Sequence, residues 1–109
     1  MRKRKVGIMG GSFDPIHIGH LVAANEALNI YKLDEIIFVP AGNPPHKKGL
    51  RADSFHRLLM VNMAVLTNDK FSVSDFEIKN SEKSYTLNTL REFHKLYENT
   101  EFYFITGTD

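Results

Sequence analysis

Apolar and polar positions alternate in blocks along the chain, and the period changes from block to block. Four short apolar runs are typical of strands, and they cover Lys5–Met9, Glu35–Pro40, Phe71–Asp75 and Glu101–Thr106. The third run alternates as an outer strand does. Between the runs, apolar residues recur at three- and four-residue steps, which predicts helices. Strands that alternate with helices favour a parallel sheet built from right-handed crossovers.

Three helices are predicted between the strands. The first covers Gly19–Tyr31. Asp53 or Ser54 can cap the second, whose apolar side holds Phe55, Leu58, Leu59, Met63 and Leu66. Thr86 can cap the third, whose inward residues are Leu87, Leu90, Phe93 and Tyr97. Loops are predicted over Ala41–Ala52 and Ile78–Lys83. We therefore expect one Rossmann-like, doubly wound α/β domain over residues 1–109, with about four parallel strands and helices on both faces.

Composition narrows the classes of protein. Of 109 residues, 42% are hydrophobic, which is enough for one core. The absence of cysteine excludes disulfides, thiolate zinc sites and cysteine nucleophiles. A net charge of +1 argues against a general nucleic-acid binder, and no run is long enough to span a membrane. We expect a cytoplasmic protein, with a homo-oligomer as the assembly to be tested. The basic run Arg2–Lys5 is either a solvated end or an arm that steers phosphates.

Polar residues follow each predicted strand. They occupy Gly10–His20, Ala41–Lys48, Asp75–Tyr85 and Gly107–Asp109. Because the carboxyl ends of parallel strands meet at one edge of a doubly wound sheet, we expect a ligand crevice there.

The segment Gly10–His20 has the order strand, glycine-rich turn and helix start, which favours phosphate binding at a helix N-terminus. Its spacing matches neither the dinucleotide fingerprint nor the Walker lysine motif. His17 and His20 are three residues apart, which places both rings on one side of the helix, where they can hold phosphoryl oxygens. Alternatively, His20 caps the helix and His17 is incidental. A metal site with Asp14 is weaker, because Asp14 precedes Pro15 and can simply fix the turn.

Five stretches together resemble a known family. They are GGSFDPIHIGH at Gly10–His20, NPPHK at Asn43–Lys47, Phe55-His56-Arg57 with Met60, SYTLNTL at Ser84–Leu90, and FITGTD at Phe104–Asp109. The first resembles the HxGH turn of the nucleotidyltransferase superfamily. The set resembles, in order and spacing, the bacterial nicotinate-nucleotide adenylyltransferases. The resemblance implies transfer of AMP from ATP to nicotinate mononucleotide, giving deamido-NAD and pyrophosphate. The attack is direct and in line, with Mg²⁺ carried by the ATP phosphates and no dedicated metal site.

The resemblance also implies roles for matching positions. His17 and His20 contact the reacting phosphates, the nucleotide pocket is formed by Gly10, Gly11, Ser12 and Phe13, and the ribose is contacted by Gly107 and Asp109. Lys47, beside the less certain His46, holds a phosphate, although a solvated loop lysine is the ordinary alternative. Tyr85 and Thr86 recognise the nicotinate group, and Thr86 can in addition cap the helix. Arg57 either faces the substrate or forms an ion pair on the helix surface.

The family carries a second signature, an ISxxxIR-like stretch that binds ATP phosphates, and the printed chain ends at Asp109 before one occurs. We therefore expect a longer parent to be the enzyme and this piece alone to have little or no activity. Two alternatives stay open. One is an adenylyltransferase for another acceptor, such as nicotinamide mononucleotide or phosphopantetheine, and the other is a non-catalytic nucleotide-binding fragment.

Overall fold

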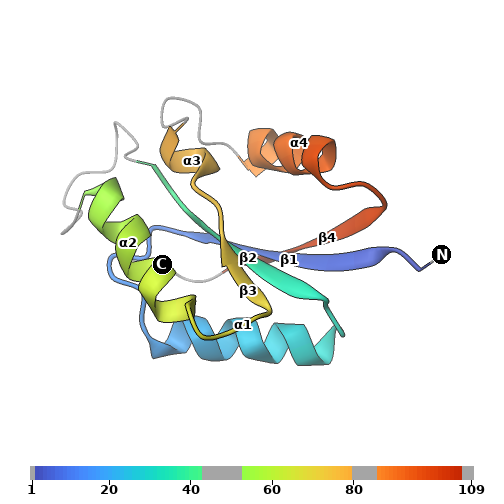
Figure 1. The fold of residues 1–109 in the computed structure, drawn as a ribbon, viewed down its shortest axis with the longest axis horizontal. Coiled ribbons are helices and arrows are strands. Elements are labelled where there is room, and N and C mark those ends of the chain that lie inside the picture. The colour runs from blue at the N-terminus through green and yellow to red at the C-terminus, as the bar shows by residue number, and fades with distance from the viewer. Residues whose placement is uncertain (1, 43–52, 80–85, 107–109) are drawn as a thin grey trace.

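The structure is a computed structural model that describes residues 2–42, 53–79 and 86–106. Its four strands form one parallel sheet in the order β3-β2-β1-β4 (Figure 1). The strands are β1 (Arg4–Gly11), β2 (Glu35–Pro40), β3 (Phe71–Val73) and β4 (Thr100–Thr106). The predicted α/β fold is confirmed, and β3 lies at the edge, as its alternating pattern predicts.

Helices cover both faces of the sheet. Helix α1 (Ile18–Ile30) lies on one face and α4 (Thr86–Leu96) on the other (Figure 1). Helix α2 (Ser54–Val65) packs in the same core as α1, and α3 (Phe76–Lys79) is a single turn between β3 and α4. Within the described part of the chain, no helix is both long and apolar enough to cross a membrane.

The side chains on the two faces of the central strands pack into two separate hydrophobic cores, because neighbouring residues of a strand point to opposite sides. Ile36 and Phe38 pack with α1 and α2. Ile37 and Val39 pack with Phe93 of α4. Strands buried on both faces in this way appear in the sequence as continuous apolar runs, which is why β1 and β2 are visible there.

Helix α2 buries a different stripe from the one that its hydrophobic pattern predicts. Phe55, Leu59, Met63 and Leu66 are 68%, 48%, 67% and 80% exposed. The buried residues of α2 are Arg57, Val61 and Val65, which follow each other at four-residue steps. A charged residue can occupy such a stripe only when buried partners satisfy it. Hydrophobicity alone does not reveal those partners, so the predicted face is wrong.

Several element boundaries also differ from prediction. Strand β1 extends through Gly10 and Gly11, which pair with Val39 and Pro40 of β2. The glycines thus end a strand instead of forming the turn.

The predicted loop from Ile78 begins inside α3, because the Ser74 hydroxyl accepts the N–H of Phe76 at 3.2 Å. An ion pair of 3.2 Å between Lys79 and Asp75 spans the same turn. Thr86 is the first residue of α4 and not a residue preceding it.

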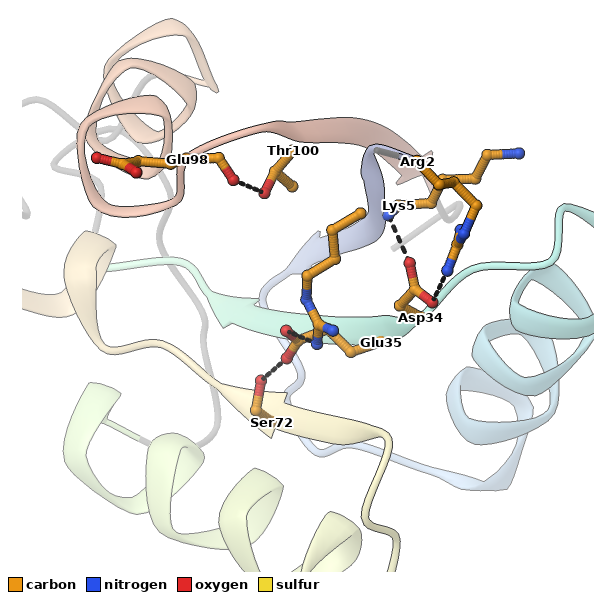
Figure 2. Close-up of polar contacts among 8 residues, drawn as sticks. Arg2, Lys5, Asp34, Glu35, Ser72, Glu98 and Thr100 are labelled. Carbon is orange, nitrogen blue, oxygen red and sulfur yellow. Dashed lines mark hydrogen bonds and ion pairs between the residues drawn. The ribbon is translucent and has the colours of Figure 1, made fainter.

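The basic residues near the start of the chain lie at the amino ends of the strands, away from the predicted crevice. Arg2 pairs with Asp34 and Arg4 with Glu35, both at 2.8 Å. Figure 2 shows this network, in which Asp34 also accepts the backbone N–H of Lys5. The arginines therefore fasten β1 to β2, and the alternative of a phosphate-steering arm is wrong for them.

Candidate functional site

The turn between β1 and α1 is built around Phe13, which is only 2% exposed. Its φ is 50°, a backbone conformation that bulky residues rarely adopt. Its ring lies 5.9 Å from Phe38 of β2 and 5.0 Å from His20, against which it packs edge-on. The Asp14–Pro15 peptide bond that follows is cis. Packing of the Phe13 ring therefore fixes the turn that joins β1 to His17 and His20.

His17 and His20 form a reciprocal cap at the start of α1. The Nδ1 atom of His17 accepts the N–H of Gly19 at 3.1 Å, and the Nδ1 atom of His20 accepts the N–H of His17 at 3.0 Å. The ring centroids are 3.8 Å apart. The prediction that both rings lie on one side is confirmed, although the helix begins at Ile18 and not at Gly19.

This cap determines how the imidazoles can act. A nitrogen that accepts a hydrogen bond carries no proton, so each neutral ring has its proton on Nε2. The Nε2–H groups are then the donors with which the two rings can bind phosphoryl oxygens at the helix N-terminus. Capping through the Nδ1 atoms is thus compatible with the predicted phosphate contact, which would use other atoms of the same side chains. The two roles are not competing interpretations of the motif.

Two glycines of the segment have opposite steric requirements. A Cβ on Gly19 would lie 2.9 Å from Cε1 and 3.0 Å from Nδ1 of His17. A Cβ on Gly10 would have, among the described residues beyond its chain neighbours, only the carbonyl oxygen of Val39 within 4 Å, at 3.9 Å. Gly19 is therefore required by the histidine pair, whereas Gly10 leaves open space at the carboxyl end of the sheet.

That space is part of a cleft of about 170 Å³, lined by Gly10, Gly11 and residues of β2, β4, α3 and α4. Glu77 and Thr89 border it, and the Thr89 hydroxyl donates to Oε2 of Glu77 at 2.6 Å. Burial raises the pKa of the Glu77 carboxyl, and the Thr89 hydrogen bond opposes that shift. Sequence reasoning gave neither residue a role, although Thr89 lies in the SYTLNTL stretch, because a lone glutamate and a helix threonine carry no distinctive pattern.

Arg57 lies beneath the turn and is fully buried. One guanidinium nitrogen, Nη1, donates to the carbonyl of Ser12 at 2.7 Å and to that of Ala41 at 2.8 Å. The other, Nη2, donates to the carbonyl of Gly42 at 3.4 Å. Burial lowers the pKa of Arg57, and the charges of Asp14 and Asp53 oppose that shift. The prediction of an ion pair on the helix surface is wrong, because backbone carbonyls bind this side chain in the interior.

The structure brings together only part of the predicted site. Gly10, Gly11, Ser12, Phe13, His17 and His20 form one continuous segment at the carboxyl ends of β1 and β2. Lys47, His46, Tyr85, Gly107 and Asp109 lie outside the described residues. The backbone of Thr86 is described, and it begins α4.

Among the described residues, no group of three or more histidine, aspartate or glutamate side chains could hold a metal ion. Asp14, His17 and His20 are among the residues searched and are not such a group.

A parallel sheet whose first strand leads through a fixed turn to two imidazoles at a helix N-terminus is an α/β arrangement suited to binding an anion at that turn. The cytidylyltransferase-like family matches residues 8–109, and the chain belongs to that family.

Among its relatives is the probable nicotinate-nucleotide adenylyltransferase of Thermoanaerobacter sp. (strain X514), which is 54% identical over 99% of this chain and 52% of the relative. Its counterpart in Desulfitobacterium hafniense (strain DSM 10664 / DCB-2) is 53% identical over 97% of this chain and 52% of the relative. The chain thus spans about half the length of the curated relatives it matches. These matches confirm the resemblance to nicotinate-nucleotide adenylyltransferases.

The chain is also similar to solved structures of a nicotinic acid mononucleotide adenylyltransferase. The nicotinic acid mononucleotide adenylyltransferase of Plasmodium falciparum, complexed with NaAD, superposes with a TM-score of 0.76 at 28% identity. The match covers 93% of this chain and 50% of that one. The same protein complexed with APC gives a TM-score of 0.72 at 27% identity.

Proposed function

We propose that this chain binds ATP and nicotinate mononucleotide and contributes to adenylyl transfer that yields deamido-NAD and pyrophosphate. The observation that carries the proposal is the pair of adjacent imidazoles at the N-terminus of α1, whose Nδ1 atoms accept backbone N–H groups. The names of the relatives support the choice of reaction. The Plasmodium falciparum structure complexed with NaAD supports the choice of acceptor.

In this proposal the phosphate of the mononucleotide attacks the α-phosphorus of ATP in line, and pyrophosphate leaves. No side chain forms a covalent bond, so catalysis depends on positioning and on stabilisation of charge at phosphorus. The Nε2–H groups of His17 and His20, together with the helix N-terminus, hold the phosphoryl oxygens. ATP binds as its Mg²⁺ complex, in which the phosphates hold the ion.

Other parts of the proposed site come from the sequence. Gly10, Gly11, Ser12 and Phe13 form the nucleotide side, with Gly107 and Asp109 at the ribose. Lys47 holds a phosphate, and Tyr85 with Thr86 recognises the nicotinate group. A cytoplasmic location, a homo-oligomeric state and low activity of this piece alone stay predictions.

Binding and turnover test the proposal together. We expect calorimetry to detect binding of ATP with Mg²⁺, and His20→Ala to weaken it by about tenfold or more, the usual effect of removing a charge-stabilising donor. His94→Ala is the control, because it removes an exposed histidine of α4 that packs against Phe102. Equal ATP affinity of wild type and His20→Ala would contradict the proposal.

Pyrophosphate release separates the alternative functions. Nicotinate mononucleotide, nicotinamide mononucleotide and phosphopantetheine are compared as acceptors at matched concentrations. Preference for nicotinate mononucleotide supports the proposed acceptor, and equal rates with the amide contradict it. These rates are measured on the full-length parent, because this piece alone is expected to have little or no activity. Nucleotide binding by the parent without pyrophosphate release from any acceptor identifies a non-catalytic binding protein.

A further inference from the structure

We propose that Arg57 is a positioning residue of the nucleotide site: its guanidinium sets the spacing between the turn that follows β1 and the segment that follows β2. The identity of the ligand rests on the proposed function, whereas the positioning role rests on the contacts of Arg57 alone.

The first step is the bridging geometry. A single nitrogen of Arg57, Nη1, contacts the carbonyl oxygens of Ser12 and Ala41 at 2.7 and 2.8 Å. These two residues lie just beyond the ends of neighbouring strands, where Gly11 pairs with Pro40. The N–H of Ala41 also donates to the carbonyl of Gly11 at 2.8 Å. The guanidinium therefore continues the linkage between the strands beyond the last paired residues of the sheet.

The second step is the path from Arg57 to the histidines. The carbonyl that Arg57 holds belongs to Ser12, the residue directly before Phe13. The ring of Phe13 contacts the ring of His20 at 5.0 Å, and His20 accepts the N–H of His17. A shift of the Ser12 carbonyl thus moves the packing partner of one imidazole and disturbs the reciprocal cap.

The third step is the chemistry that arginine supplies. A guanidinium is planar and presents several N–H donors in fixed directions, so it can bind carbonyls from two segments at once. An ammonium group on a flexible stem does not reproduce that geometry. Methionine keeps an apolar stem but has no donor, and it leaves the buried carbonyls without this partner, which is costly.

The role is separable from the packing of α2. Val61 and Val65 are buried in the core that α2 shares with α1, at 0% and 5% exposure. They hold the helix through contacts that do not involve the guanidinium. Loss of Arg57 is therefore expected to loosen the turn before it releases the helix.

Hydrogen exchange of Arg57→Met tests this without any ligand. We expect the amides of His17, Gly19 and Ala41 to exchange at least about tenfold faster, as for the loss of charged hydrogen bonds. Amides that join β1 to β4 should keep their wild-type protection. Arg91→Met, which removes an exposed arginine of α4, is the matched control. Unchanged exchange in the turn, or an equal rise throughout the sheet, overturns the proposal.

A spectroscopic signature accompanies the exchange data. The ring resonances of His20 should shift in Arg57→Met, while those of His94 on α4 stay unchanged as an internal reference. If Arg57→Met does not fold, Arg57→Lys decides: faster exchange confined to the turn supports the proposal. Wild-type exchange in the turn of Arg57→Lys, or loss of protection in the whole sheet, overturns it.

The affinity of the Arg57 variants for ATP with Mg²⁺ then tests whether the positioning role of Arg57 affects nucleotide binding. We expect Arg57→Met, or Arg57→Lys if only that variant folds, to bind ATP about tenfold more weakly than wild type and Arg91→Met. Equal affinity in a variant whose turn exchanges faster overturns the link to the nucleotide site. A wild-type chain that binds no ATP refutes the proposed function instead, and the exchange data still decide the positioning role.

Discussion

Gly19→Ala offers a test of how the histidine pair depends on a missing side chain. The added Cβ would lie 2.9 Å from Cε1 and 3.0 Å from Nδ1 of His17, closer than carbon atoms normally approach. The imidazole is the end of a side chain that can rotate, so we expect His17 to swing away while the backbone stays in place. Its Nδ1 then no longer accepts the N–H of Gly19.

The magnitudes indicate that stability changes little. Loss of a capping hydrogen bond costs about 1 kcal/mol, and replacing glycine by alanine in a helix gains up to about 1 kcal/mol. Because the two effects oppose each other, the free energy of unfolding should stay within about 1 kcal/mol of wild type. Under the proposed function, ATP affinity should fall by about tenfold, because one of the proposed phosphate-binding donors has moved.

Urea unfolding and calorimetry with ATP and Mg²⁺ measure the two effects separately. Asn25→Ala is the control for helix propensity, because Asn25 is an exposed residue of the same helix. It should gain a few tenths of a kcal/mol with no change in ATP affinity. The reasoning is refuted if Gly19→Ala binds ATP as wild type does while the His17 ring has moved.

Three further predictions concern the core and the cleft. Gly7→Ala should lower stability by about 1–3 kcal/mol in urea unfolding, because a Cβ would lie 2.6 Å from Cδ1 of Ile36; an unchanged midpoint contradicts this. Val61→Ala should cost about 2 kcal/mol, whereas Met63→Ser should stay within about 0.5 kcal/mol; the reverse order would restore the face that hydrophobicity predicts. Burial raises the pKa of Glu77, so this residue favours folding below its unfolded pKa and loses that contribution as pH rises through the folded value. The melting temperature of Glu77→Gln relative to wild type should therefore rise as the pH increases above about 4, and a constant difference speaks against the buried carboxyl.

The sheet could be predicted from the sequence because its two central strands, β1 and β2, are buried on both faces. Runs such as Ile36–Val39 leave few alternatives, and the alternation with helices determines the topology. The candidate turn could be predicted for a related reason. Glycines, a helix start and two histidines three residues apart favour an anion site, and the spacing also placed both histidines on one side of the helix start, where they form a reciprocal cap.

Arg57 could not be predicted, because its partners are backbone carbonyls that carry no side-chain signal. For the same reason, the buried face of α2 was predicted wrongly. The more apolar stripe of this helix, which includes Phe55 and Met63, faces outward. The signal that did exist was the four-residue spacing from Arg57 to Val61 and Val65. It is visible only when an arginine is considered as an interior residue.

The central place of β1 in the sheet also has a consequence for folding kinetics. β1 pairs with β4 along its length, from Arg4 opposite Thr100 to Gly10 opposite Thr106, as the neighbouring strands in Figure 1 show. Contacts between such distant parts of a chain form slowly, because a long loop must close first. During synthesis, β1 can join β2 early, but its other edge stays unpaired until β4 has left the ribosome. In that interval, the apolar edge of β1 is open to incorrect partners.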